Sequence, residues 1–282
     1  MLKIYICFWL KIYKMKEIYT RALSGAIYVA LLIGGILYHQ FSFLAIFICF
    51  SAICLWEFQK LIHYKNFLLF GILFGGFYMA HFVKIPPSFT WGMLGVTLFI
   101  QLLLLKDLLF IRIIPMFEKK KFIVSVFYLI SCFLFITLIP FDALGNYHAI
   151  YVLGILILIW VNDTFAYLSG KSFGKHKLYE KISPKKTIEG FAGGFIACVI
   201  SGILIHYFSR TLLMVHWVAI AVITSVFGTI GDLIQSKFKR QAGVKDSGKI
   251  MPGHGGVFDR LDSVLYAAPF VYLYLQIIYY VS

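Results

Sequence analysis

Long apolar segments separated by short polar or charged ones recur along the whole chain. Nine of them are predicted to be membrane-spanning helices, which need about 20 mainly apolar residues, or fewer where the membrane is thinned. The predicted spans are residues 23–38, 41–55, 67–82, 89–105, 122–138, 149–168, 191–207, 217–234 and 264–281. The pattern predicts an all-α, polytopic integral membrane protein with about nine transmembrane helices.

The composition supports this fold class. Of 282 residues, 61% are hydrophobic and only 13% are charged, and the mean hydropathy is +0.88. Soluble domains have about 25% charged residues, and so few charges could not cover so much apolar surface in water. The composition therefore excludes a soluble globular domain, a disordered chain and a disulfide-stapled secreted scaffold.

The net charge of +14 is explained by topology. When the nine spans are laid out, 24 of the 26 Lys and Arg residues fall in the N-terminal segment and in alternate connections, and only Lys84 and Arg210 fall in the others. By the positive-inside rule, the cation-rich connections and the N-terminus are cytoplasmic. A nucleic-acid partner, which such a charge suggests in a soluble protein, is not expected.

Three regions follow from this layout. Residues 1–22 form a basic cytoplasmic segment, residues 23–150 hold the N-terminal transmembrane helices, and residues 151–282 hold a catalytic transmembrane region with two basic cytoplasmic loops. Translation could start at Met1 or at Met15, and the sequence leaves both open.

The 12 acidic residues fall into two groups. Solvated charge at the membrane boundary is expected for five that flank spans: Glu17, Glu57, Asp107, Glu118 and Asp142. The other seven lie in the C-terminal half: Asp163, Glu180, Glu189, Asp232, Asp246, Asp259 and Asp262. Of these, Asp163 and Asp232 lie at the cytoplasmic ends of otherwise apolar helices, where a carboxylate is costly unless it is paired or binds a cation. These two aspartates predict a functional site, with structural pairing to a nearby Lys as the alternative.

Each of these aspartates leads into a strongly basic loop. In the first loop, Ser183-Pro184 is typical of a helix start, with Ser as N-cap and Pro in the first position. Lys185 and Lys186 beside such a helix N-terminus would make a phosphate-binding site.

The second loop carries more specific chemistry. Asp259 and Asp262 are three residues apart and Asp232 and Ser236 four apart, so each pair shares a helix face. Residues 252–256, Pro-Gly-His-Gly-Gly, allow close approach of backbone N–H groups to a ligand. The carboxylates suit Mg²⁺. Phosphate charge would be held by Lys237, Lys239, Arg240, Lys245 and Arg260. The combination indicates phosphoryl or nucleotidyl transfer at a membrane surface.

These residues resemble the bacterial phosphatidate cytidylyltransferases, also called CDP-diacylglycerol synthases. Residues 236–262 follow the C-terminal signature of that family without a gap: Ser-x-apolar-Lys-Arg, Lys-Asp, Pro-Gly-His-Gly-Gly and Asp-Arg-apolar-Asp. Residues 163–190 are similar to its second motif, including Ser-Pro-Lys-Lys-Thr-x-Glu-Gly at 183–190. The first 150 residues match only as a run of spans.

The resemblance implies that CTP and phosphatidic acid give CDP-diacylglycerol and pyrophosphate. The catalytic residues that it implies are Asp232, Asp259, Asp262, Lys245, His254 and Arg260. For His254, a purely structural role is the alternative to a hydrogen bond with a phosphate. Substrate-binding residues would be Lys185, Lys186, Thr187, Ser236, Lys239, Arg240, Gly253, Gly255 and Gly256. Mg²⁺ ligands would be Asp232 and Asp259 first, with Asp262 and Asp246 next.

The resemblance also implies a homodimer and a second, monovalent cation such as K⁺. It predicts a multi-pass protein of the inner (cytoplasmic) membrane, with its active site on the cytoplasmic side and the lipid bilayer as its environment. Two other readings stay open: a membrane lipid kinase that uses a nucleoside triphosphate, and a transporter, which ranks lower because the acidic residues gather at one edge.

Overall fold

The computed structural model describes the backbone of residues 2–111, 113–114, 120–142 and 144–281, and the side chains within these ranges from residue 19 to residue 280. Within these ranges, eight helices are long and apolar enough to cross a membrane, and a ninth apolar helix is shorter. The predicted all-α, polytopic fold is therefore confirmed. Each predicted span overlaps one of these nine helices, and the short one corresponds to the span predicted at residues 67–82.

The first half of the chain consists of helices only: α1 (Leu2–Tyr38), α2 (Gln40–Leu61), α3 (Leu68–Phe82), α4 (Pro87–Phe110), and a run made of α6 (Lys121–Val124), the π-helix η1 (Ser125–Ile130) and α7 (Ser131–Leu138). The second half contains α8 (Ala149–Phe173), β1 (Lys177–Tyr179), β2 (Ser183–Thr187), α9 (Ile188–Ser209), α10 (Met214–Gln241) and α11 (Phe258–Val281). The connection between α10 and α11, residues 242–257, is called the α10–α11 loop below.

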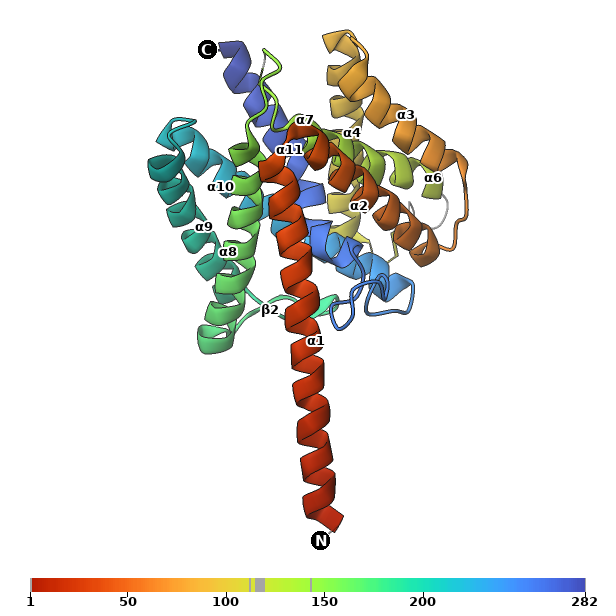
Figure 1. Ribbon diagram of the computed structural model, residues 1–282, viewed down its shortest axis with the longest axis vertical. Coiled ribbons are helices and arrows are strands. Elements are labelled where there is room, and N and C mark those ends of the chain that lie inside the picture. The colour runs from red at the N-terminus through yellow and green to blue at the C-terminus, as the bar shows by residue number, and fades with distance from the viewer. Residues whose placement is uncertain (1, 112, 115–119, 143, 282) are drawn as a thin grey trace.

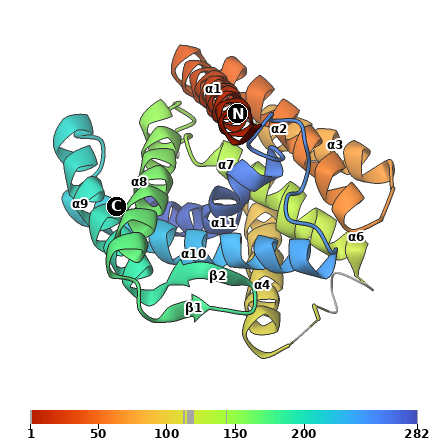
Figure 2. The same cartoon turned by 90° about the horizontal axis from the view of Figure 1, so that it is seen from below.

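The two chain ends lie at opposite ends of the bundle, as an odd number of crossings requires (Figure 1). The β1–β2 hairpin and the α10–α11 loop lie toward the end from which the N-terminal part of α1 extends (Figures 1 and 2). α1 is continuous through the proposed boundary at residue 22. The side chains before Tyr19, and with them most of the predicted basic segment and Glu17, lie outside the described residues.

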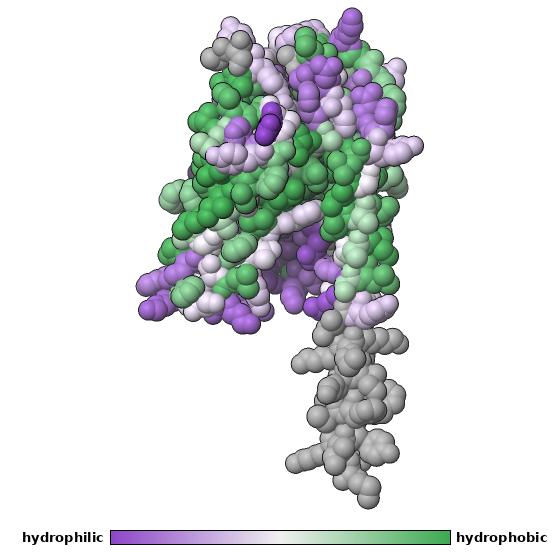
Figure 3. Space-filling view, turned by 60° about the vertical axis from the view of Figure 1, so that its left-hand side comes forward, coloured by the Kyte–Doolittle hydropathy of each residue, from purple (hydrophilic) through white to green (hydrophobic). Residues whose placement is uncertain are grey.

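The surface has the distribution expected in a bilayer. Figure 3 shows a broad hydrophobic belt between two hydrophilic ends, with hydrophilic side chains recessed at the lower end. On α1, Leu23, Ile27 and Leu31 are all more than half exposed and four residues apart, so they share one face. Exposed apolar side chains in this number would be unfavourable in water, whereas contact with lipid is favourable for them.

Close helix packing in the second half depends on glycines. α9 packs against α8 and against α10. A Cβ at Gly194 would lie 2.6 Å from the carbonyl oxygen of Asn162 in α8, and one at Gly202 would lie 2.8 Å from that of Trp217 in α10. Because only glycine fits, the three helix backbones approach closely, as is common for small residues in membrane bundles.

An aromatic cluster joins the two halves beside the α10–α11 loop. Phe58 of α2 lies 5.6–6.0 Å, centroid to centroid, from the rings of Tyr128, Phe238 and Phe258. These three rings belong to η1, α10 and α11, and all four side chains of the cluster are fully buried. Tilted and edge-on contacts of this kind stabilise packing beyond the area they bury, so the cluster fixes the end of α2 against the start of α11.

One local prediction is wrong. Ser183-Pro184 does not begin a helix: residues 183–187 form strand β2, which pairs antiparallel with β1. Helix α9 begins at Ile188, and the extended Thr187 is its N-cap, with its hydroxyl accepting a hydrogen bond from Gly190 N at 3.1 Å. Thr caps a helix as Ser does, and a proline is tolerated in a two-stranded hairpin because both strands are edges.

Candidate active site

A cavity of about 380 Å³ lies where α8, β2, α9 and α10 meet. Asp163 of α8 and Asp232 of α10 line it together with Lys185, Lys186 and Thr187 at β2. Figure 2 shows β2 running beside α10 at this end of the bundle. The hairpin, which replaces the predicted helix start, therefore brings the lysines of the first basic loop to the carboxylate that precedes the second.

Asp232 is held by charge and by a hydroxyl. Its Oδ2 lies 2.5 Å from Nζ of Lys186, and its Oδ1 accepts a hydrogen bond from Ser236 Oγ at 3.1 Å. The predicted pairing of Asp232 and Ser236 on one helix face is thus confirmed. The contact with Lys186 joins two segments that lie far apart in the sequence.

Asp259, at the start of α11, is surrounded by donors. Its Oδ1 accepts from Nζ of Lys239 at 2.8 Å. Its Oδ2 accepts from Ser247 N at 2.8 Å, Ser247 Oγ at 2.9 Å and Gly256 N at 2.9 Å. Four donors to one carboxylate leave it little freedom to move. The N–H of Gly256, predicted to face a ligand, is directed at Asp259 instead.

Asp163, Asp232 and Asp262 form an acidic group. Asp232 repels both Asp163 and Asp262 electrostatically, and Asp262 is only 8% exposed. Like charges held close together out of water are costly unless a cation compensates them or one of the carboxylates takes up a proton. In the part of the chain that the structure describes, no three His, Cys, Asp or Glu side chains converge closely enough to form a complete metal site.

His254 lies between the α10–α11 loop and α1. Its Nδ1 is 2.9 Å from Ser24 Oγ, and its carbonyl oxygen accepts a hydrogen bond from Arg260 Nη2 at 2.8 Å. Burial, followed by the positive charges of Arg260 and Arg21, lowers the pKa of His254 below its ordinary value of 6.5. Gly253 and Gly255 on either side have positive φ angles of 76° and 89°, which explains why both are glycine.

Several residues that were predicted to bind phosphate or metal lie outside this cavity. Arg240, Lys245 and Asp246 are exposed and do not line the cavity. Lys237, predicted to hold phosphate, is 5% exposed, and its Nζ donates to the carbonyl oxygens of Asp107, Leu108 and Ile111 at the end of α4. A lysine there satisfies carbonyls that have no partner within the helix, so Lys237 is structural.

The expectation of solvated charge fails for two acidic residues. Asp107 is 6% exposed and Glu57 is fully buried. The sequence did hold a signal for Glu57: it is an acidic residue near the end of an apolar helix, the same criterion that selected Asp163 and Asp232. Asp142 is hydrogen-bonded within its own exposed loop, and Glu118 lies outside the described residues.

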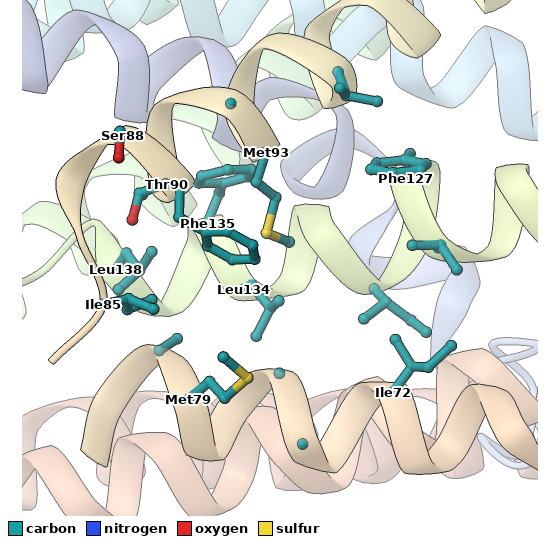
Figure 4. A pocket seen from close by; sticks show the side chains of 18 residues that line it. Ile72, Met79, Ile85, Ser88, Thr90, Met93, Phe127, Leu134, Phe135 and Leu138 are labelled. Atoms are coloured by element: carbon teal, nitrogen blue, oxygen red, sulfur yellow. The ribbon is translucent and has the colours of Figure 1, made fainter. Parts of the chain in front are cut away.

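A larger cavity, of about 730 Å³, lies between α3, α4 and the η1–α7 segment. Figure 4 shows it lined by apolar side chains such as Met79, Met93 and Phe135, with Ser88 and Thr90 near one another at one side. None of the described residues that line it is ionisable. The charged groups that suit a phosphate line the smaller cavity, which is the candidate active site.

Fold and site together define a polytopic membrane protein with carboxylates and lysines gathered at one end of its bundle. The chain belongs to the cytidylyltransferase family, whose sequence profile matches residues 19–278. It is 31% identical over 270 residues to a phosphatidate cytidylyltransferase of Bacillus subtilis (strain 168), which covers 93% of this chain and 97% of that one. Phosphatidate cytidylyltransferases of Staphylococcus aureus (strain COL) and Staphylococcus haemolyticus (strain JCSC1435) are 48% and 46% identical over 127 residues, 44% of this chain and 48% of theirs.

Proposed function

We propose that the protein transfers the cytidylyl group of CTP to phosphatidic acid, giving CDP-diacylglycerol and pyrophosphate for phospholipid synthesis. One structural observation supports this proposal independently of the names of the relatives. The Lys186–Asp232 pair places cationic and anionic groups in the same cavity at a membrane boundary. A cavity with both can hold a triphosphate through its lysines and a cation through its carboxylates.

In the proposed reaction, an oxygen of the lipid phosphate forms a bond to the α-phosphorus of CTP. The bond from that phosphorus to the bridging oxygen of the β-phosphate breaks in line, and pyrophosphate leaves. Both reactants are anionic, so catalysis consists mainly of positioning and charge neutralisation. Lys185 and Lys186 bind triphosphate oxygens in this scheme, and Lys239 keeps Asp259 oriented.

The acidic group fits a divalent cation. Asp163, Asp232 and Asp262 supply hard oxygen donors whose mutual repulsion a cation would relieve. Mg²⁺ usually keeps water and substrate phosphates among its ligands, so the protein need supply only part of its coordination. Bound there, Mg²⁺ would neutralise charge that develops on the phosphates. Asp232 and Asp259 are the proposed principal ligands, and Asp262 and Asp246, which is exposed in the α10–α11 loop, are secondary ones.

The lipid phosphate needs cations of its own. Arg21 and Arg260 lie around His254, close enough for both to act on its charge. α1, which carries Arg21, also exposes the apolar face of Leu23, Ile27 and Leu31. We assign the phosphate of phosphatidic acid to this side of the α10–α11 loop, where its acyl chains can stay in the bilayer.

The sidedness and assembly belong to the same proposal. The positive-inside distribution supports an active site on the cytoplasmic side of the inner membrane. The resemblance to the family supports a homodimer and a monovalent cation such as K⁺. Accessibility labelling of a cysteine introduced at Lys245 in intact cells tests the side, light scattering in detergent tests the dimer, and activity with and without K⁺ tests the cation.

The decisive experiment compares nucleotides and products. Purified full-length protein in detergent is incubated with phosphatidic acid, Mg²⁺ and either CTP or ATP. We expect CDP-diacylglycerol and pyrophosphate in equal amounts from CTP, and no lipid product from ATP. A nucleoside diphosphate with a newly phosphorylated lipid would establish a lipid kinase, and solute flux into proteoliposomes without nucleotide would establish a transporter; either result overturns the proposal.

A further inference from the structure

We propose that Glu57, a buried residue of α2 outside both basic loops, is a positioning residue for Asp259. The proposal rests on the proposed function, since it concerns how that site is held in its working geometry. Glu57 is fully buried, and it comes from the N-terminal half of the chain, which the sequence motifs do not cover.

Among the described residues, the side chain of Glu57 accepts hydrogen bonds from the α10–α11 loop and from the start of α11. Its Oε2 accepts a hydrogen bond from Phe258 N at 2.9 Å, and its Oε1 accepts from Val257 N at 3.3 Å. The first N–H groups of a helix have no acceptor within that helix. Glu57 therefore caps α11 from another helix, and its negative charge also suits the positive end of the helix dipole.

This cap is connected to Asp259 through one hydroxyl. Ser247 Oγ lies 2.9 Å from Oδ2 of Asp259 and 3.4 Å from Oε2 of Glu57. A hydroxyl has one proton to donate, and the shorter distance assigns it to Asp259. Glu57 and Asp259 also repel each other. The two carboxylates thus hold opposite sides of the same short segment, and moving Glu57 would move the donors of Asp259.

Two glycines of the loop leave space for Glu57. A Cβ at Gly248 would lie 2.1 Å from Oε1 of Glu57, and one at Gly256 would lie 2.5 Å from Oε2. Both distances are far below van der Waals contact, so alanine at either position must displace the carboxylate or the loop. The neighbouring Phe58 is fixed in the aromatic cluster of α2, η1, α10 and α11. α2 therefore cannot withdraw without unpacking that cluster.

The first experiment compares Glu57→Gln with Gln59→Ala. Gln59 is a matched control because it is also buried on α2, but it bonds Asn66 at the α2–α3 connection. We expect Glu57→Gln to lower kcat about 10- to 100-fold, the range for losing hydrogen bonds to a charged acceptor. The KM for CTP should change by less than about threefold, because Lys185 and Lys186 are held by other elements. Equal losses of kcat in the two variants would overturn the proposal.

The second experiment does not depend on the enzymatic activity of the protein. Hydrogen exchange of the full-length protein in detergent is measured at the amides of Val257 and Phe258. We expect at least about tenfold faster exchange in Glu57→Gln, with α9 amides unchanged. Unchanged exchange at 257 and 258 overturns the proposal. If the wild-type protein made no CDP-diacylglycerol, the proposed function would fail while this measurement still tested whether Glu57 holds the loop.

Gly248→Ala keeps the proposal testable if Glu57→Gln does not fold. Its methyl group pushes the Glu57 carboxylate without changing any charge, so we expect the same fall in kcat and the same faster exchange. Gly228→Ala is the matched control, because its Cβ would sit at an ordinary 3.5 Å from Ser263 Cβ. Wild-type kcat and exchange in Gly248→Ala would overturn the proposal.

Discussion

Nζ of Lys186, at β2, lies 2.5 Å from Oδ2 of Asp232, in α10. Lys186 compensates the charge of a carboxylate on the apolar helix α10, where an unpaired carboxylate would be costly. This pair can rearrange when substrate binds. The triphosphate would be a second anionic partner for Lys186, and a divalent cation would be a second cationic partner for Asp232.

Replacing Lys186 should weaken nucleotide binding. We expect Lys186→Gln to raise the KM for CTP about 10- to 100-fold, because a charge-assisted contact with the triphosphate is lost. Steady-state kinetics at saturating phosphatidic acid measure this. Lys181→Gln is the control, since Lys181 is exposed in the same hairpin and does not line the cavity. An unchanged KM in Lys186→Gln would remove the lysine from the nucleotide site.

Asp259→Asn should abolish activity while the protein still folds. The amide has nearly the same size, but its NH₂ group would face the donors of Ser247, Gly256 or Lys239. We expect a loss of kcat of at least about 100-fold, because charge and orientation are lost together. Turnover of CTP and a thermal melt are measured on the same preparation. Near-wild-type turnover would contradict the role assigned to Asp259.

Removing divalent cations should stop the reaction reversibly. We expect EDTA to abolish turnover and added Mg²⁺ to restore it. Asp232→Asn should raise the Mg²⁺ concentration needed for half-maximal activity about tenfold or more, because one anionic ligand becomes neutral. Asp142→Asn is the control, an aspartate whose side chain accepts hydrogen bonds within its own loop. Full activity in EDTA would exclude the proposed Mg²⁺ dependence.

Acidification should destabilise the protein through His254. Its pKa in the folded protein lies below the ordinary value of 6.5, owing to burial and to the charges of Arg260 and Arg21. The unfolded chain then takes up a proton first, so stability is lost as pH falls from about 6.5 toward the lowered pKa. We expect His254→Asn to flatten this part of the melting-temperature profile.

The control for the pH profile is His63→Asn. His63 is exposed and has a positive φ of 49°, a conformation that asparagine adopts readily. His63→Asn makes the same substitution at an exposed site, and its melting-temperature profile is the reference for His254→Asn. A wild-type slope in His254→Asn would show that another group causes the loss.

Gly202→Ala should destabilise the contact between α9 and α10. Its Cβ would lie 2.8 Å from the carbonyl oxygen of Trp217, so the helices must move apart, at a cost of about 1–3 kcal/mol. Thermal melts in detergent should show the loss. Gly95→Ala, where a Cβ meets nothing within 4 Å, should melt like the wild type, and equal melting of both variants would refute the packing argument.

Element boundaries were predicted less well than the elements themselves. The span predicted at 217–234 is part of α10, which continues to Gln241 and thereby places Lys239 beside Asp259. Hydropathy marks only the part of a helix that lies in hydrocarbon. The backbone hydrogen bonds continue into the polar end, where the residues of the site are located.

The functional residues likewise include some whose contacts the sequence predicts and others whose contacts it does not. The pairing of Asp232 with Ser236 follows from helical spacing alone and was predicted correctly. The exposure of Arg240 and Lys245, and the use of Lys237 to cap α4, could not be predicted, because all three lie in one basic segment with similar local sequence. Which of them faces a ligand depends on what packs beside α10.

The membrane-spanning architecture follows from the sequence alone, because each apolar segment must lie in hydrocarbon whatever its neighbours are. The side chains that share one helix turn also follow from the sequence, since helical geometry is local. The contact of Lys186 with Asp232 and the capping of α11 by Glu57 depend on how the helices and the hairpin pack in three dimensions. Those contacts join segments far apart in the chain, and they form because buried charges and unpaired helix-end N–H groups must find partners wherever packing brings them.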